Sequence, residues 1–434
     1  MNKYQSYKPS GVKWIGEIPV GWKISKYKYN LSILSGFPFK SELFDPTEGF
    51  PILRIRDITS GKCETFYKGE YTIEQIVSDD DLLVGMDGDF TVRWWEGGNV
   101  LLNQRCCRIN PHSTLSKRFL YYTLPDYLKI VNDLTYYTTV KHLSNDDIRG
   151  VKITLPPLPE QEQIVKYLDE KTSQIDQLIS ITEKKIEGLK EKRTSLINHI
   201  VTKGLDSNVE MKDSGVEWIG KIPKHWIVGS FRFFVKLRHG FQFRDGDFTD
   251  EGIKIVKITQ LHRDGYLDIS SCSYVDSNRL NEFQDILIKE DDILMCLTGG
   301  TIGKIIRVGQ VEEPLFQNYR VGHFSSKVNH LSDNYLFYLM SSNVISGQIF
   351  FDVRETGQPN IGLEDFNKMK VCIPSLNEQE QIVEHLVNQT KKIDEIISIE
   401  RKRIETLKEY RQSLISEVVT GKVRVCEESS ILME

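Results

Sequence analysis

The chain lacks paired cysteines, long apolar runs and an excess of positive charge. Its cysteines form no Cys-x-x-Cys pair, which argues against a zinc site, and their odd number argues against a disulfide framework. We therefore expect reduced thiols that pack in the interior. The seven are Cys63, Cys106, Cys107, Cys272, Cys296, Cys372 and Cys426.

No segment approaches the roughly 18 consecutive apolar residues of a membrane helix, and the opening residues MNKYQSYKPS lack the apolar core of a signal peptide. These absences favour a cytoplasmic protein. The net charge of −5 excludes a uniformly basic nucleic-acid-binding protein. Binding to duplex DNA would therefore need basic side chains gathered on one face, together with a partner that completes the contact with the phosphates.

Signatures of catalysis are also missing. There is no HExxH motif and no Asn-Pro-Pro-aromatic tetrapeptide. The segment Thr298–Ile305 resembles a phosphate-binding loop, but it lacks the first glycine at the required spacing, and no Ser or Thr follows Lys304. We interpret it as a glycine-rich turn. The sequence predicts that the chain is not an enzyme by itself and binds no metal or cofactor.

What the chain does contain is an internal repeat. Residues 159–203 match residues 377–421 at 25 of 45 positions, and residues 7–22 match residues 211–226 at 10 of 16. Most of the sequence between the matching blocks differs. The chain is therefore a tandem duplication with similar ends and divergent middles, which suggests two reading domains on one frame.

The repeated segments 159–203 and 377–421 have the apolar heptad pattern of a coiled coil. Two arrangements fit this pattern: the two helices pair with each other antiparallel, or each helix packs on its own globular domain. Thr182, Glu400, Arg193 and Arg411 interrupt the apolar seam and can fix its register. The seam residues are Leu168, Ile175, Ile179, Ile186, Leu189, Leu196, Leu386, Ile393, Ile397, Ile404, Leu407 and Leu414.

The helix starts carry recognisable signals. Prolines precede the first helix, with Glu160 in its first turn, and Asn377 followed by Glu380 is typical of a capping box at the start of the second helix. Gly204 and Gly421 are natural terminators.

The middles, about 23–155 and 227–372, favour mixed α/β domains with many short strands. They hold 17 basic and 17 acidic residues, and 16 and 19, respectively. Shared signposts, such as GFPFK at 36–40 against GFQFR at 240–244, indicate a common fold. We expect residues 52–56 to form a strand that carries two arginines on one face.

Polar residues recur at matching places in both middles. Arg, Lys, Asn and Gln have the donors and acceptors that read base edges. We therefore predict DNA contacts from Arg54, Arg56, Gln104, Arg105, Lys141, His142, Lys257, Thr301, Lys304, Gln317, Tyr319, Arg320, Gln358 and Asn360. Taken singly, each is more typical of a solvated or turn residue.

Together these motifs resemble the specificity subunit of type I restriction-modification enzymes. The resemblance rests on SGVxWIGxIPxxW before each middle, LPPLPEQEQIV and IPSLNEQEQIV at the start of each long helix, and TGGTIGK with FQNYR in the second middle. It implies a non-catalytic subunit whose two target-recognition domains bind the halves of a bipartite DNA target. It also implies two long antiparallel coiled-coil helices that set the gap between the halves, in a pseudo-two-fold repeat.

The resemblance further implies partners that carry the chemistry: two adenine-N6 methyltransferase subunits with S-adenosylmethionine, and two motor-nuclease subunits that need ATP and magnesium. In the first middle, Met86-Asp87-Gly88-Asp89 replaces Thr301-Ile302-Gly303-Lys304, so a DNA contact is not carried over to that loop. An insertion at Thr202–Leu205, where the chain leaves the first helix, should then change the gap.

We expect α/β (α+β) recognition domains at 1–155 and 205–372, spacer helices at 156–204 and 373–425, and a tail at 426–434. Two alternatives stay open: a specificity subunit of a methyltransferase without a nuclease, and a coiled-coil adaptor that does not bind DNA. The neighbouring genes would distinguish the first alternative from a complete restriction-modification system. The near-neutral charge is the reason why the second alternative stays open.

Overall fold

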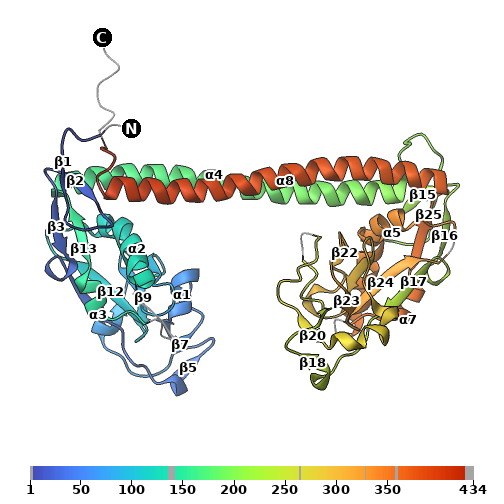
Figure 1. Ribbon diagram of the computed structural model, residues 1–434, viewed down its shortest axis with the longest axis horizontal. Coiled ribbons are helices and arrows are strands. Elements are labelled where there is room, and N and C mark those ends of the chain that lie inside the picture. Colours follow the sequence, from blue (N-terminus) through green and yellow to red (C-terminus); the bar gives the residue numbers. More distant parts are fainter. Residues whose placement is uncertain (1–2, 135–141, 263–264, 328, 357–359, 426–434) are drawn as a thin grey trace, which may run out of the picture. The chain divides into compact units, whose positions relative to one another are not determined.

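The computed structural model describes residues 3–134, 142–262, 265–327, 329–356 and 360–425. The chain divides into two compact units. Unit 1 comprises Met1–Glu183 and Lys402–Glu434, and unit 2 comprises Lys184–Arg401. Each unit thus contains a part of both long helices, α4 (Leu158–Lys203) and α8 (Leu376–Val419) (Figure 1).

The remaining elements follow a similar order in the two units. In unit 1 they are β1 (Tyr7–Pro9), β2 (Glu17–Pro19), β3 (Lys23–Lys26), β4 (Leu31–Ser35), β5 (Phe44–Asp45), β6 (Phe50–Leu53), α1 (Ile55–Ser60), β7 (Phe66–Tyr67), β8 (Ile76–Val77), β9 (Leu82–Gly85), β10 (Val92–Trp94), β11 (Val100–Leu102), β12 (Cys106–Pro111), α2 (Lys117–Leu134), α3 (Asn145–Gly150) and β13 (Lys152–Leu155). In unit 2 they are β14 (Met211–Asp213), β15 (Lys221–Pro223), β16 (Ile227–Ser230), β17 (Val235–His239), β18 (Phe248–Thr249), β19 (Ile253–Val256), β20 (Ser273–Val275), β21 (Ile293–Cys296), β22 (Ile305–Arg307), β23 (Leu315–Gln317), β24 (Val321–Ser326), α5 (Asp333–Met340), α6 (Asn343–Thr356), α7 (Leu363–Lys368) and β25 (Lys370–Ile373).

The two units share their sheet topology. An antiparallel sheet runs β10-β9-β12-β4 in unit 1 and β22-β21-β24-β17 in unit 2. A second sheet contains one parallel pair, β6 with β11 in unit 1 and β19 with β23 in unit 2. The common fold that the signposts predicted is therefore confirmed. Among the described residues the units differ in detail, since the second sheet has five strands in unit 1 and four in unit 2, and α5 and α6 of unit 2 stand where unit 1 has the helix α2.

Within each unit, α4 and α8 run antiparallel. Asp176 accepts from Arg411 in unit 1, with 3.0 Å between Nε and Oδ1. Arg193 and Asp394 make the equivalent contact in unit 2, also at 3.0 Å. The predicted register arginines thus each pair with an aspartate of the other helix. Exposed pairs of this kind add little stability, but they are compatible with only one register.

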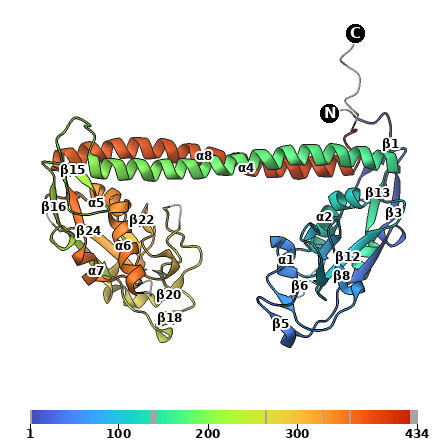
Figure 2. The same ribbon diagram turned by 180° about the vertical axis from the view of Figure 1, so that it is seen from behind.

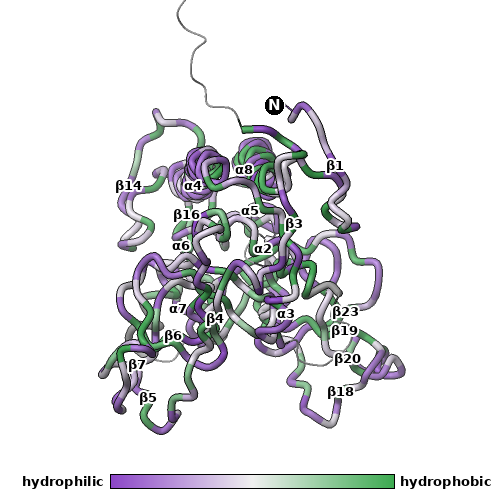
Figure 3. The backbone as a smooth tube through the Cα atoms, turned by 90° about the vertical axis from the view of Figure 1, so that its left-hand side faces the viewer, coloured by the Kyte–Doolittle hydropathy of each residue, from purple (hydrophilic) through white to green (hydrophobic). Residues whose placement is uncertain are grey.

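Hydrophobic packing provides the stability of the helix pair. Every one of the twelve predicted seam residues is buried or half-buried in the structure. Figure 3 shows both helices end-on, each with hydrophilic and hydrophobic residues, and helices with one apolar side contain both kinds. Glu400 is buried at the seam and accepts from Lys185 at 2.5 Å, within unit 2. The antiparallel arrangement, rather than separate packing of each helix, is therefore the one found.

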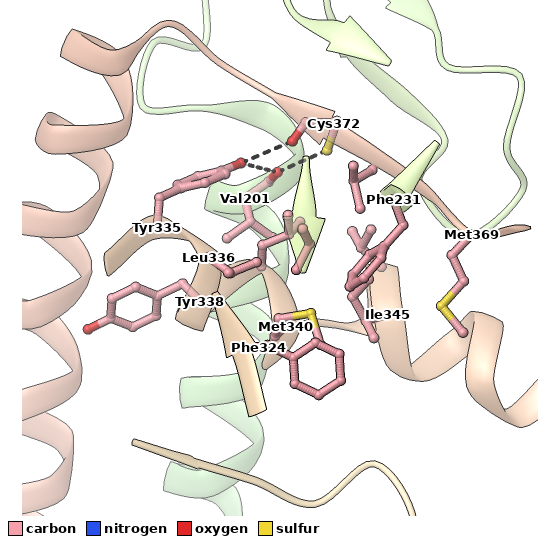
Figure 4. Close-up of a cluster of buried hydrophobic side chains, with 14 of the residues drawn as sticks. Val201, Phe231, Phe324, Tyr335, Leu336, Tyr338, Met340, Ile345, Met369 and Cys372 are labelled. Atoms are coloured by element: carbon pink, nitrogen blue, oxygen red, sulfur yellow. Dashed lines mark hydrogen bonds between the residues drawn. The ribbon is translucent and has the colours of Figure 1, made fainter. Parts of the chain in front are cut away.

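Each unit holds the end of one long helix against its core. In unit 2 the Tyr335 hydroxyl lies 3.4 Å from the carbonyl oxygens of Val201 and Cys372, amid a cluster of buried apolar side chains (Figure 4). In unit 1 the Thr154 hydroxyl donates to the carbonyl of Val419 at 2.8 Å. Val201 and Val419 hold matching positions in the repeat, so the carbonyl near the end of α4 in unit 2 and the one near the end of α8 in unit 1 each accept a hydrogen bond from the core of the unit.

A buried glutamine fixes the start of each long helix. Gln161 accepts from Ser116 N at 2.8 Å and donates to the carbonyls of Thr114 and Pro156 at 3.1 and 2.9 Å. Gln379 makes the equivalent three bonds in unit 2. Both side chains are fully buried. These bonds tie the long helix to the loop that leads into α2 or α5.

The predicted start of the second helix needs a correction. Helix α8 begins at Leu376, so Asn377 lies inside the first turn and is not the N-cap of a box with Glu380. Instead, Ser375 Oγ accepts from Glu378 N at 3.4 Å. Gly421 follows the helix with φ of +77°, and a Cβ there would lie 2.4 Å from Pro19 Cδ, so the position requires glycine.

The six described cysteines are free and buried or half-buried, and Cys426 lies outside the described residues. Burial raises the pKa of the Cys107 thiol to about 12, which keeps it protonated. Among the described residues, no helix combines the length and apolar character needed to cross a bilayer. In the same residues, no three His, Cys, Asp or Glu side chains gather as a metal site would require.

Candidate nucleic-acid interface

Three chain segments meet in unit 1 where strands of the antiparallel sheet end. Met86, just after β9, donates its N–H to the carbonyl of Arg105 at 2.9 Å and accepts from Leu143 N at 2.7 Å. Asp87 and His142 form an isolated β-bridge. We call the side chains of Asp87, Arg105 and His142 the unit 1 junction.

Unit 2 builds the same arrangement at the same place. Leu297 N donates to the carbonyl of Arg320 at 3.0 Å, and Ile361 N donates to the carbonyl of Leu297 at 2.9 Å. Thr298 and Asn360 form the bridge. The unit 2 junction therefore consists of Thr298, Arg320 and Asn360, and an arginine is common to both junctions.

A close backbone contact lies next to each junction. Phe37 pairs with Asn103 and Phe241 with Asn318 in isolated parallel bridges. A Cβ at Gly36 would lie 2.0 Å from the Asn103 carbonyl oxygen. One at Gly240 would be equally close to the Gln317 carbonyl oxygen. The repeated Gly-Phe motif is therefore explained by close packing of backbone, which only glycine permits.

Gln104 and Tyr319 occupy matching positions beside the junction arginines. Gln104 N donates to the carbonyl of Phe37, and Tyr319 N to that of Phe241, both at 3.0 Å. Gln104 is exposed. The guanidinium of Arg320 lies 5.3 Å from the Tyr319 ring centre and donates from Nε to the Tyr319 hydroxyl at 2.7 Å. This contact orients the side chain of an exposed cation.

Thr301 and Lys304 lie in the turn between β21 and β22, beside the unit 2 junction. Thr301 ends a short 3-10 helix. The turn has positive φ angles at Gly299 and Gly303, which glycine readily adopts. A hollow of about 350 Å³ lies between this turn and α6. The glycine-rich segment is thus a hairpin turn at the edge of the candidate surface, as the sequence indicated.

Arg54 and Lys257 directly follow strands β6 and β19 of the second sheet, and Arg56 lies in α1. The predicted strand over 52–56 is wrong, because β6 ends at Leu53 and Arg54 precedes α1. The Asp57 carboxylate accepts from Arg54 N at 2.9 Å and so starts the helix. Arg54 and Arg56 therefore do not share one face of a strand.

Arg56 is tied down within unit 1, donating to Thr65 Oγ1 at 3.0 Å. Lys257 is equally engaged in unit 2, since Nζ donates to Ser273 Oγ at 2.7 Å and lies 4.4 Å from the Phe248 ring centre. Both cations therefore have partners within the protein, and the structure gives them no place at a junction.

Gln317 requires a correction, because its side chain is fully buried. Nε2 donates to the carbonyls of Arg238 and Val321 at 3.0 and 2.7 Å, and Oε1 accepts from the Arg238 guanidinium at 3.3 Å. Burial lowers the pKa of Arg238. Gln317 therefore supports the strand behind the junction and cannot reach a base. Leu102, its counterpart in unit 1, is also fully buried.

Of the other predicted contacts, Lys141 and Gln358 lie outside the described residues. Sequence reasoning missed Asp87, which it set aside with its loop, and the helix-start glutamines Gln161 and Gln379. The signal for the glutamines was present, since the motif EQEQ occurs at the same place in both copies.

Two matching sheets and one junction in each unit, with an antiparallel helix pair in a duplicated chain, define a two-domain recognition protein. The chain belongs to the family described as type I restriction modification DNA specificity domain, whose model matches residues 19–191 and 238–409. Both copies of the repeat are thus members of one domain family.

Relatives match along nearly the whole chain. The type I restriction enzyme MjaVIII specificity subunit of Methanocaldococcus jannaschii is 27% identical over 413 residues, covering 94% of each chain. The EcoBI specificity subunit of Escherichia coli is 28% identical over 405 residues, covering 90% of this chain and 84% of its own. A solved structure from a study of assembly of a type I R-M system is 13% identical, with a TM-score of 0.65 over 94% of this chain and 99% of its own, which shows a common fold.

Proposed function

We propose that this chain is the specificity subunit of a type I restriction-modification complex and reads a bipartite DNA target, one half with each unit. The observation that carries this proposal is the pair of junctions. Their backbone hydrogen bonds are equivalent, whereas two of their three side chains differ. One scaffold that carries different polar side chains suits the reading of two different half-sites.

The chemistry of the junctions supports contacts with base edges. Arginine donates to guanine O6 and N7, and asparagine pairs with adenine N6 and N7. Arg105, Arg320 and Asn360 are exposed. Arg105 and Arg320 lie on short loops directly before strands β12 and β24, and Asn360 lies between helices α6 and α7. Such loops bring side chains to the groove while the sheet behind them keeps their spacing fixed.

We assign the reactions to partner subunits. Two methyltransferase subunits that bind S-adenosylmethionine methylate adenine N6, and two motor-nuclease subunits use ATP and magnesium to cleave DNA. Towards the middle of each long helix, exposed apolar residues stand at matching repeat positions: Leu178 and Ile181 in unit 1, Ile396 and Ile399 in unit 2. Matched apolar pairs on one molecule favour two equivalent docking surfaces, and hence two copies of one partner.

The net charge of −5 supports this division of labour. Phosphate neutralisation dominates the affinity of most DNA-binding proteins. The isolated chain is therefore expected to bind its target weakly at physiological salt and to gain affinity and selectivity when the methyltransferase subunits are added. Fluorescence anisotropy across a salt series measures this, and tight, selective binding by the chain alone would contradict it.

Mapping of methylated adenines in the host genome tests the proposal. Replacing Arg320 or Asn360 with Ala should relax or abolish one half-site and leave the other unchanged. Arg232→Ala, an exposed arginine at the other end of unit 2, is the control and should leave both halves unchanged. Simultaneous changes in both half-sites would rule out two independent reading units. Methylation without cleavage of unmodified phage DNA would identify a methyltransferase complex that has no nuclease.

A further inference from the structure

The two junctions differ in charge, and the difference lies at a single matching position. Asp87 in unit 1 corresponds to Thr298 in unit 2, since each forms the bridge to the third segment. The arginine is common to both. Any difference in what the two junctions prefer must therefore depend largely on this carboxylate and on its histidine neighbour.

In unit 1 the three side chains form a connected set. The Arg105 guanidinium donates from Nη1 to Asp87 Oδ1 and Oδ2, at 3.3 and 3.1 Å. His142 Nδ1 lies 2.7 Å from Asp87 Oδ1. The side chain of Asp87 is 22% exposed, and those of Arg105 and His142 are 53% and 52% exposed. The carboxylate is thus held from two sides beneath two exposed side chains.

Both charged groups keep hydrogen-bonding capacity. A guanidinium has five N–H groups, and the Asp87 contacts use only those of Nη1. A carboxylate offers about four lone-pair sites, so Asp87 can accept another hydrogen bond. The pair therefore presents donors and an acceptor side by side.

We propose that Asp87 and Arg105 together read one G·C base pair in the half-site of unit 1, with His142 holding the carboxylate in place. This inference rests on the proposed function. In the major groove, guanine presents the acceptors N7 and O6, and its cytosine presents an amino donor beside them. Arginine next to a carboxylate is complementary to that order. An A·T pair in the same orientation would instead place the thymine O4 acceptor opposite the carboxylate, and the reversed pair would place the thymine methyl group opposite the guanidinium, so both fit less well.

Unit 2 provides the internal comparison. Thr298 carries no charge, and Arg320 contacts the hydroxyl and the ring of Tyr319 instead. A hydroxyl both donates and accepts, so it does not select against an acceptor on the base. The unit 2 junction therefore has no carboxylate that would disfavour an A·T pair at the matching place.

The experiment uses the complete complex with Asp87→Asn and Asp87→Thr, the second giving unit 1 the residue found in unit 2. Genome-wide mapping of methylated adenines should show one G·C position of one half-site becoming degenerate in both variants. In competition binding with duplexes that vary each position, discrimination at that position should fall about tenfold or more. Competition binding also tests a variant complex that binds DNA but no longer methylates it.

The outcomes separate this inference from the function on which it rests. A wild-type complex that methylates no bipartite site would remove the proposed function. A bipartite wild-type motif that stays the same in both Asp87 variants would overturn only the reading by Asp87. So would a change at a position that is A·T in the wild type. An unchanged second half-site shows that the variant complexes are folded and assembled.

Discussion

Burial decides what Gln317 does. Its amide makes three hydrogen bonds inside unit 2, so Gln317→Ala should remove one hydrogen bond from each of two carbonyls and one from the Arg238 guanidinium. We expect a loss of about 2 kcal/mol or more in unfolding free energy. Chemical denaturation of the purified chain measures this.

Arg320→Ala is the comparison for Gln317→Ala. The Arg320 side chain is exposed, so its removal should change stability by less than about 0.5 kcal/mol, while it alters the DNA target. A stable Gln317→Ala variant with a changed half-site would return Gln317 to the reading surface.

The same contrast explains how much of the site the sequence predicted. Residue types and recurrence in both copies identified Arg105, Arg320 and Asn360, which meet at equivalent junctions. They could not identify Gln317 as buried, because the residue type alone does not distinguish an exposed glutamine from a buried one. Asp87 was missed because its loop departs from the pattern of the second copy, and its role depends on the nearby Arg105.

At the scale of elements, the heptad pattern separates two kinds of isoleucine on α8. Ile397 is buried, whereas Ile399 is 66% exposed. Ile397→Ala should lower the unfolding free energy by about 2 to 4 kcal/mol. Ile399→Ala should be nearly neutral for stability but weaken binding of the methyltransferase subunit. Denaturation and a pull-down of the coexpressed subunit measure the two effects, and equal destabilisation by both variants would contradict the assignment of faces.

The hydrogen bonds of Gln379 at the start of α8, which we call the helix-start clamp, offer a second test on the same helix. Gln379 bonds three backbone groups, while Gln381 is exposed two residues later. Gln379→Ala should lower stability by about 2 kcal/mol or more and speed hydrogen exchange at the start of α5. Gln381→Ala should do neither. Similar exchange in both variants would mean that the clamp is dispensable.

Helices were the elements that the sequence predicted best, because one apolar stripe repeats over their whole length. The strand over 52–56 failed for a local reason. Its alternation of apolar and basic residues suits a strand, but Asp57 captures the N–H of Arg54 and turns the chain into α1. A single side-chain bond outweighed the pattern there.

At the scale of the whole molecule, we propose that the helix pair sets the gap between half-sites. Seven residues inserted in both helices, after Glu183 and after Arg401, keep the heptad register. Such an insertion adds about 10 Å at 1.5 Å per residue, or about three base pairs at 3.4 Å each. Methylome mapping should show the gap lengthened and both half-sites unchanged.

An insertion at Thr202–Leu205 is the matched control. Val201 is already fixed in the unit 2 core, so residues added beyond it lengthen only the connection to β14. The structure thus revises the sequence-based expectation for this position, and the gap should stay the same. A gap that changed with this insertion, but not with the paired heptads, would refute the role of the helices.

The division of unit 1 between the two ends of the chain also governs how the protein is made. The core of unit 1 includes Ile15 and Trp22 near the N-terminus but also Leu414 and Val418 of α8. A ribosome that has finished the first half of α4 must add roughly 240 further residues before these partners emerge. At about 5 to 20 residues per second, the apolar side chains of unit 1 stay exposed for some tens of seconds, until the residues of α8 that bury them have been synthesised. Unit 2, whose segments are contiguous, can close sooner, so the part made first is completed last.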